Sequence, residues 1–390
     1  MKVAFYMNCV SAHQLPLAKE VAERVGPENF CYVDAGEKSE SAQRGEVQGL
    51  KFKVQSIEDA AAETAAVRGD NAREWLETAD VMLTGRRDLA LFERRAKKGL
   101  KTYYTSERWF KPVQIVRLFG LFDCSISGWV RMLVPGYRRM VKRFVKWANE
   151  DEGARVLAIG PWAKMDFLRM GVKAEKIVEW GYFVEPGTGA RRPVYEGVRA
   201  EGAGARRPGY EGARILWGGR MLDLKRVDTI IRAVARIREE GRGKREEVRV
   251  TLVGNGPEKE KLMALARKLG LSVEIEQSNN RTIPSVRFLP SQPMAKMREL
   301  MREHDLYVFA SNGYEGWGAV VSEALEEGMN VIGTFEAGAS ATLLPKERLF
   351  HSGDWRTLAA LIVKEIKGEL PPCGIGEWTA KFGAKRLLEV

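Results

Sequence analysis

The amino-acid sequence predicts an α/β protein with two Rossmann-like parallel-sheet domains that face a central cleft. Three observations lead to this fold class. Short apolar runs of strand length alternate with segments of helical periodicity, which is the pattern of βαβ units. One duplicated segment rich in Gly, Ala, Arg and Pro interrupts the alternation, which then starts again. The length of 390 residues suits two domains that each bury a core.

The first domain is expected over residues 1–186. Its predicted strands lie at 3–7, 30–33, 54–55, 81–84, 102–105 and 156–159, and its predicted helices at about 16–24, 72–78, 89–98 and 162–171. His13 follows the first strand, at the edge where open α/β sheets bind ligands, so it is a candidate contact for a substrate. The alternative is that His13 is an ordinary polar loop residue that contacts no substrate.

The duplicated segment reads GARRPVYEG at 189–197 and GARRPGYEG at 204–212. It has no apolar period with which to bury a core, so residues 187–213 are predicted to be a linker or surface loop. The second domain is expected over 214–375, with strands at 249–253, 286–289, 306–310 and 330–333 and helices at about 258–269, 294–303 and 319–327. Residues 376–390 are predicted to form a last helix that packs back on the first domain.

The charge balance favours an anionic partner. The net charge is +11 and the isoelectric point about 9.4, which suits nucleic acid, phosphorylated small molecules or an acidic membrane surface.

The four cysteines, Cys9, Cys31, Cys124 and Cys373, are scattered and form no CxxC pair, so we expect reduced thiols rather than disulfides or a zinc site. Without a membrane-length apolar run or a signal peptide, a cytoplasmic location is expected, with peripheral attachment to the inner face of the membrane as an option.

Residues 129–147 carry six Lys or Arg and no acidic residue. The apolar residues Met140, Val141, Phe144, Val145 and Trp147 fall roughly on one face of a helix. Such a basic amphipathic helix is typical of the interface of an anionic membrane. A helix that packs on the core and leaves its basic face in water is the alternative.

Residues 305–328 combine a buried strand, a loop and a helix, and they place two carboxylates, Glu315 and Glu323, eight positions apart. The loop lies at the carboxyl edge of the predicted sheet, where ligands of open α/β folds bind. Gly316 and Gly318 flank Trp317 at the start of the helix, where free N–H groups and the positive helix end favour an anion. Glu323, inside the helix, is able to accept hydrogen bonds from paired hydroxyls such as those of a ribose.

Two further motifs follow strands of the second half. Gly218 and Gly219 permit close backbone approach, and Arg220 with Lys225 could clamp a diphosphate. The segment GNGP at 254–257 resembles the start of a dinucleotide fingerprint, but Lys259 stands where the third glycine would be, which disfavours a dehydrogenase. P-loop, HExxH and GxSxG motifs are absent from the sequence, which disfavours P-loop NTPases, zincins and α/β-hydrolases.

The order GGR…K at 218–225, GNGP at 254–257, VRFL at 286–289 and EGWG…EAL at 315–325 resembles retaining glycosyltransferase family 4 of the glycosyl transferases group 1, which has the GT-B fold. The resemblance is strong over about 214–345 and elsewhere consists of the βαβ rhythm and of the residues IGP at 159–161, GV at 171–172 and EKI at 175–177. It implies a nucleotide-diphosphate sugar as donor, no metal and no other cofactor. The implied catalytic residues are Glu315, Arg220 and Lys225.

The resemblance also implies further roles. Glu323 would bind the ribose, Glu315 the donor sugar, and the backbone of Gly316, Trp317 and Gly318 the sugar and phosphate. The remaining implied donor-side residues are Gly219, Gly254, Asn255 and Leu289, and the acceptor-side candidates are His13 and Glu107. The sequence departs from the family pattern at Ala310-Ser311, at Arg226 and in the loop 8–14.

Together these features predict a metal-independent hexosyltransferase that transfers a sugar to a saccharide or lipid-linked saccharide in cell-surface polysaccharide synthesis. A nucleotide-sugar epimerase or hydrolase of the same fold is the alternative. A basic nucleic-acid-binding protein is less favoured, because it would explain the charge but not the paired glutamates.

Overall fold

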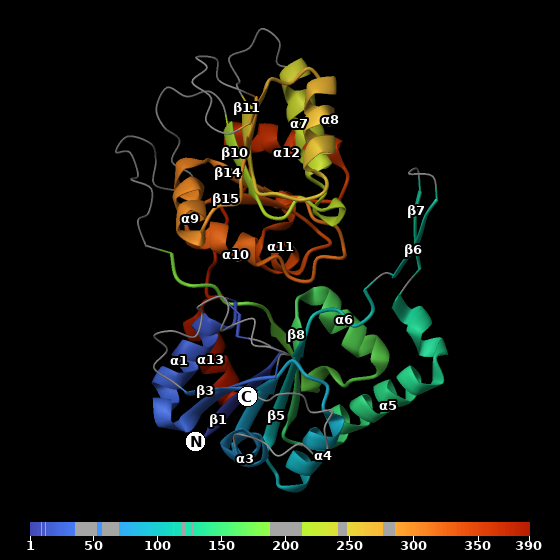
Figure 1. The fold of residues 1–390 in the computed structure, drawn as a ribbon, viewed down its shortest axis with the longest axis vertical. Helices are drawn as coiled ribbons and strands as arrows, with labels where there is room; N and C mark the ends of the chain where they lie inside the picture. Colours follow the sequence, from blue (N-terminus) through green and yellow to red (C-terminus); the bar gives the residue numbers. More distant parts are fainter. Residues whose placement is uncertain are drawn as a thin grey trace. The chain divides into compact units, whose positions relative to one another are not determined.

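The computed structural model describes residues 1–8, 10–11, 13–35, 53–56, 70–111, 113–118, 122–126, 128–187, 213–240, 248–275 and 285–390. They divide into two compact units. Unit 1 consists of Met1–Glu185 and Glu377–Val390, and unit 2 of Pro186–Gly376. Within the described residues, each unit is built on a seven-stranded sheet in which all paired strands are parallel, with helices packed against it (Figure 1). The predicted α/β class with two parallel-sheet domains is confirmed.

The sheet of unit 1 has the strand order β3-β2-β1-β4-β5-β8-β9. The strands are β1 Val3–Met7, β2 Phe30–Asp34, β3 Lys53–Ser56, β4 Val81–Thr84, β5 Lys101–Ser106, β8 Ala154–Ile159 and β9 Ile177–Trp180. The helices are α1 Leu15–Val25, α3 Asp70–Thr78, α4 Leu89–Lys97, α5 Pro135–Glu150, α6 Pro161–Met170 and α13 Ala380–Glu389, with short 3-10 turns η1 Pro27–Asn29, η2 Gly128–Leu133 and η3 Ala174–Lys176. Strand β1 is buried along its whole length, as expected for a parallel strand covered on both faces.

The C-terminal helix α13 lies beside α1 in unit 1 (Figure 1). Arg24 of α1 donates a hydrogen bond to the backbone oxygen of Lys381 at 3.3 Å. The rings of Phe183 and Trp378 stack with their centroids 5.9 Å apart. A Cβ at Gly383 would lie 2.5 Å from the Phe183 ring, so the close approach of α13 depends on that glycine. The end of the chain therefore completes the core of unit 1.

Between β5 and β8 the chain forms two strands that the sequence analysis does not predict. Strands β6 Val113–Leu118 and β7 Phe122–Ile126 pair antiparallel as a two-stranded sheet, separate from the main sheet. Turn η2 and helix α5 follow. On α5, Val141, Phe144 and Trp147 are buried in the core of unit 1. The apolar face of α5 thus packs on the core, as the alternative stated, and a membrane contact of residues 129–147 stays a prediction.

The sheet of unit 2 has the order β12-β13-β11-β10-β14-β15-β16. The strands are β10 Ala213–Gly218, β11 Val248–Val253, β12 Val273–Ile275, β13 Val286–Leu289, β14 Leu306–Phe309, β15 Asn330–Thr334 and β16 Leu349–Phe350. The helices are α7 Val227–Glu240, α8 Lys259–Lys268, α9 Met294–Glu303, α10 Ala319–Glu326, α11 Gly338–Leu343 and α12 Trp355–Lys367, with 3-10 turns η4 Asp223–Lys225 and η5 Lys346–Arg348. The sequence did not predict α11, β16 or α12, although Asp354 and Gly368 cap α12 at its two ends.

Several sequence-based expectations concern residues that the structure does not describe. The duplicated motifs at 189–197 and 204–212 lie outside the described residues, as does Cys9, and the side chain of Cys124 is not described. Cys31 is buried and Cys373 half-buried. In the described part of the chain, no helix is long and apolar enough to cross a membrane.

Candidate active site

The carboxyl ends of four neighbouring strands in unit 2 are tied together by backbone hydrogen bonds. After β10, the N–H of Gly219 donates to the oxygen of Val253 at 2.9 Å, and after β11 that of Gly254 donates to Leu289 at 2.9 Å. The N–H of Met221 reaches Asn255 at 2.8 Å, and that of Asn312, in the loop after β14, reaches Leu224 at 2.8 Å. The loops after β10, β11, β13 and β14 therefore form one connected surface at the edge of the sheet where open α/β folds bind ligands.

Two glycines of the GNGP segment make this surface possible. Gly254 has φ 134°, and a Cβ there would lie 1.9 Å from the backbone oxygen of Gly219. Gly256 has φ 157°, and its Cβ would lie 2.3 Å from the oxygen of Met221. Both distances are too short for any side chain. These glycines therefore allow the loop after β11 to lie against the turn that carries Arg220.

The structure brings two of the predicted catalytic residues into contact. The ammonium of Lys225, at the end of η4, donates a hydrogen bond to the Glu315 carboxylate in the loop after β14. Their side chains are only 22% and 18% exposed. The ammonium also lies 6.0 Å from the centre of the Phe309 ring. The guanidinium of Arg220, in contrast, is exposed and makes no hydrogen bond or ion pair with any described residue.

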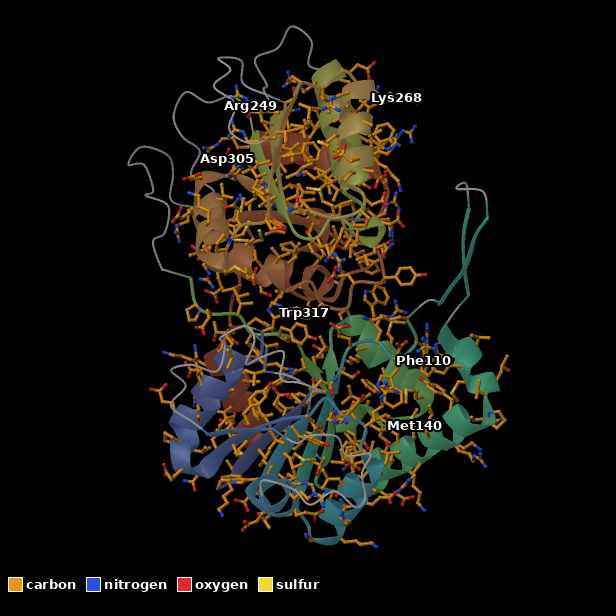
Figure 2. All side chains as sticks on the ribbon, viewed as in Figure 1. Phe110, Met140, Arg249, Lys268, Asp305 and Trp317 are labelled. Atoms are coloured by element: carbon orange, nitrogen blue, oxygen red, sulfur yellow. The ribbon has the colours of Figure 1, made fainter. Side chains whose placement is uncertain are left out.

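The loop 315–318 is held rigidly in front of helix α10. The backbone oxygens of Gly316 and Trp317 accept hydrogen bonds from Gly338 at 3.1 Å and Ala339 at 2.9 Å. Trp317, labelled in Figure 2, is fully buried. Gly318, the N-cap of α10, has φ 88°, and a Cβ there would lie 2.5 Å from the Phe309 ring. The indole thus anchors the loop in the core, and any contact of this loop with a ligand is made by its backbone and by Glu315.

Glu323 of α10 is a buried acidic residue. The residue is 7% exposed, and its carboxylate makes no hydrogen bond or ion pair with any described residue. Burial raises the pKa of this carboxyl, and the positive charge of Arg298 offsets part of that effect. The arrangement suits a ligand that supplies hydroxyl donors.

Tyr307 of β14 is a site residue that the sequence analysis missed. Its buried hydroxyl donates to the backbone oxygen of Gly218 at 3.0 Å and accepts from the Gly218 N–H at 3.0 Å. Burial raises the pKa of this phenol well above its usual value, so it stays a neutral donor. A tyrosine inside an apolar strand gives no signal of this role, because strand aromatics usually serve packing.

Residues 210–372 match the family model described as Glycosyl transferases group 1. This span includes every residue of the surface described above. Unit 2 is therefore similar to the group 1 glycosyltransferases over these residues. No curated protein matches the chain in sequence.

Three solved structures share the fold over nearly the whole chain. HepE of Anabaena, in complex with UDP, has a TM-score of 0.60 at 16% identity, covering 100% of this chain and 94% of that chain. The lipopolysaccharide outer core galactosyltransferase WaaB has a TM-score of 0.61 at 16% identity, with 99% and 98% covered. A glycosyltransferase from Rickettsia africae has a TM-score of 0.55 at 15% identity, with 99% and 92% covered. These similarities support the GT-B fold for the whole chain.

The remaining donor-side candidates of unit 2 take part in contacts of the loops. Gly219 and Leu289 take part in the hydrogen bonds between loops. The side chain of Asn255 is exposed and accepts a hydrogen bond from Lys259 at 3.2 Å. Among the described residues, no group of three or more His, Cys, Asp or Glu side chains is placed to hold a metal ion.

The acceptor-side candidates of unit 1 meet through a tyrosine that the sequence analysis did not select. The ring of His13, after β1, stacks on Tyr182, after β9, with centroids 5.7 Å apart. The Tyr182 hydroxyl donates to the Glu107 carboxylate, after β5, at 3.1 Å. Lys111 donates to the other oxygen of Glu107 at 2.7 Å. Three segments far apart in the sequence therefore form one polar and aromatic cluster at the carboxyl edge of this sheet.

Asp166 of α6 fixes the segment that carries Glu107. Its buried carboxylate accepts a hydrogen bond from the Phe110 N–H at 3.1 Å and lies 3.8 Å from the guanidinium of Arg108. Burial raises the pKa of Asp166, while the backbone hydrogen bonds and Arg108 favour its ionised form. Asp166 thus helps to hold the loop after β5, which carries Glu107.

Proposed function

We propose that this protein is a retaining, metal-independent glycosyltransferase of family 4 type. It transfers a hexose from a nucleotide-diphosphate sugar to a saccharide or lipid-linked saccharide in the synthesis of a cell-surface polysaccharide. The similarity of unit 2 to the group 1 glycosyltransferases supports the transferase class. The observation that carries the proposal is the Lys225–Glu315 pair at the carboxyl edge of the unit 2 sheet, together with Glu323, a buried residue whose carboxylate makes no hydrogen bond or ion pair with any described residue.

In this proposal each group of the donor has a matching residue. Arg220, which is exposed and unpaired among the described residues, and Lys225 hold the diphosphate. Glu323 accepts hydrogen bonds from the ribose hydroxyls. Glu315 binds the sugar hydroxyls, with the backbone of 316–318 beside the sugar and phosphate. HepE was solved with UDP and with UDP-glucose, so a uridine donor is the first to test.

In this proposal, Lys225 and Glu315 exchange their mutual ion pair for contacts with the donor when the donor binds. Without donor, the two side chains satisfy each other. The diphosphate draws the Lys225 ammonium toward itself and leaves the Glu315 carboxylate available to the sugar. When the bond between the anomeric carbon and the diphosphate oxygen breaks, the leaving diphosphate takes up negative charge. Arg220, Lys225 and the backbone at the start of α10 stabilise that charge, while the acceptor hydroxyl passes its proton to an oxygen of the leaving diphosphate and its oxygen bonds to the anomeric carbon.

A ligand screen tests the donor site directly. Thermal shift is measured with UDP, GDP, ADP, CMP and their sugar conjugates on the wild type, Lys225→Ala and Glu323→Ala. One nucleoside diphosphate is expected to stabilise the wild type, with a weaker shift in both variants. No shift with any nucleotide would contradict the transferase proposal. Release of free sugar without acceptor, seen by product analysis, would instead favour the hydrolase or epimerase alternative.

On the acceptor side we propose that the His13–Tyr182–Glu107 cluster binds the saccharide. This ligand suits the cluster, because a carboxylate accepts hydrogen bonds from sugar hydroxyls and aromatic rings pack on the face of a sugar.

We further propose a cytoplasmic enzyme that contacts an anionic membrane through part of residues 129–147. A membrane-bound acceptor would then be presented to unit 1.

A further inference from the structure

The corner where η2 meets α5 in unit 1 exposes three aliphatic side chains. Leu133 is 80% exposed, Val134 56% and Val130 38%, and Leu133 is the most exposed large apolar side chain among the described residues. Such side chains point to an interaction surface when they lie together on a rigid element. They are not part of the apolar face of α5 that the sequence analysis selected, which is buried.

The inner side of the corner is firmly packed. The ring of Trp129 stacks on Phe110 with centroids 3.8 Å apart, and Tyr137 contacts the edge of the same ring at 6.3 Å (Phe110 is labelled in Figure 2). Met132 and Tyr137 also pack against the hydrophobic core of unit 1. The aliphatic side chains are therefore held outward by a structured support.

The cations along the segment fall into two sets. Near the aliphatic tip, four exposed cations make no ion pair or hydrogen bond with any described residue: Arg131, Arg138, Arg139 and Lys142. Farther along α5, Arg143 forms a two-point ion pair with Glu93, with one nitrogen–oxygen distance of 2.5 Å, and Lys146 lies 3.9 Å from Glu150. Uncompensated positive charge is thus concentrated where the aliphatic side chains are exposed.

We propose that this corner, Val130–Val134 with Arg138, Arg139 and Lys142, docks on an anionic lipid surface. The aliphatic side chains enter the boundary between headgroups and acyl chains, and the cations bind lipid phosphates. Nucleic acid is a poorer match, because binding to unpaired bases uses exposed aromatic rings, whereas the exposed apolar groups here are aliphatic. The inference rests on the proposed function in one respect: such docking would hold the transferase where a lipid-linked acceptor lies.

Vesicle co-sedimentation with matched charge variants tests the proposal. The probes are vesicles of phosphatidylcholine alone and vesicles of phosphatidylcholine and phosphatidylglycerol in equal parts. Arg138→Ser/Arg139→Ser removes two unpaired cations, and Arg143→Ser/Lys146→Ser removes two paired cations from the same helix. We expect the wild type to bind only the anionic vesicles. The first double variant should bind at least about tenfold more weakly, since each cation near the surface contributes about fivefold, and the second should bind nearly as well as the wild type.

Leu133→Ser/Val134→Ser separates insertion from charge attraction. It keeps every cation, and we expect it to weaken binding at least about tenfold. Three outcomes would overturn the proposal: no binding of the wild type, equal losses in the two charge variants, or full binding by the aliphatic variant. Retention of RNA in place of anionic vesicles would overturn it as well.

The nucleotide thermal shift, measured on the same variants, separates this inference from the proposed function. An unchanged shift shows that the variants are folded and that their donor site is intact. A wild type that binds vesicles but no nucleotide would contradict the transferase alone. One that binds nucleotide but no vesicles would contradict the lipid contact alone.

Discussion

The carboxyl edges of the two sheets are built in different ways. In unit 2, backbone hydrogen bonds join the loops after four strands, and glycines at 254, 256 and 318 permit the contacts. In unit 1, the side chains of His13, Tyr182 and Glu107 join three segments. A surface made by backbone leaves a pattern of glycines in the sequence. A cluster made by side chains leaves only single polar or aromatic residues, which resemble many others.

The largest expected effect tests whether backbone contact builds the unit 2 surface. Gly254→Ala would place a Cβ 1.9 Å from the Gly219 oxygen, so the two loops must separate. We expect a loss of about 3 kcal/mol of unfolding free energy together with loss of nucleotide binding. Gly270→Ala is the control, because Gly270 has φ 73° with open space around it and should cost only about 1 kcal/mol. Equal effects of the two substitutions on unfolding by denaturant would contradict the role of loop contact.

The second prediction concerns Glu323, whose ionised form is destabilising in the folded protein without ligand. Because burial raises its pKa, the folded state binds more protons than the unfolded state between the ordinary glutamate pKa and the raised one. Stability therefore falls as pH rises through that window. We expect Glu323→Gln to unfold at a higher temperature at neutral pH than the wild type, yet to bind nucleoside diphosphate about 10–100-fold more weakly.

The same carboxyl predicts a pH dependence of donor binding. Nucleotide affinity of the wild type should fall as pH decreases through the raised pKa, because protonation removes the anionic acceptor. Glu323→Gln should lack this component. Calorimetric titration over a range of pH checks both predictions, and parallel pH profiles for the two proteins would exclude Glu323 from the donor site.

The third prediction makes the same change, Tyr to Phe, at the carboxyl edge of each sheet and compares the effects on the two substrates. Tyr182→Phe removes the hydrogen bond to Glu107, and Tyr307→Phe removes the two hydrogen bonds to Gly218. We expect Tyr182→Phe to raise the KM for acceptor about fivefold with unchanged nucleotide affinity, and Tyr307→Phe to weaken nucleotide binding with unchanged KM for acceptor. Steady-state kinetics and calorimetry distinguish them. If both variants change the same parameter, the two clusters do not serve separate substrates.

The difference between the edges also explains what the sequence could predict. The strand–loop–helix at 305–328 and the glycine turn at 218–219 are each visible in a short stretch of sequence. The sequence therefore predicts the fold and the surface that carries Lys225 and Glu315. It does not predict the long-range contacts of Tyr182 and Tyr307, because a hydroxyl at the end of an aromatic side chain finds its partner only after folding. The apolar period of α5 was correctly read as amphipathic, but period alone does not say whether core or lipid covers the face.

The smallest expected effect concerns Arg226, next to Lys225 and the place where the sequence departs from the family's glycine. Arg226 has φ 47°, the only positive φ of a described residue other than glycine. This conformation costs about 1 kcal/mol for an L-residue. The guanidinium bonds the Asp228 carboxylate at 3.1 and 3.2 Å, and both side chains are 31% exposed, so the pair contributes at most about 1 kcal/mol.

The cost of the left-handed backbone at Arg226 and the stabilisation by the Arg226–Asp228 ion pair therefore nearly cancel in the unfolding free energy. Arg226→Gly should change the unfolding free energy by less than about 1 kcal/mol, because it removes both terms. Arg226→Ala removes only the pair and keeps the strain, so it should be the less stable of the two by about 1 kcal/mol in denaturant unfolding. Nucleotide affinity should stay unchanged in both, since the guanidinium is directed to Asp228. A loss of affinity in both variants would instead make Arg226 a donor contact and extend the cationic clamp beyond Arg220 and Lys225.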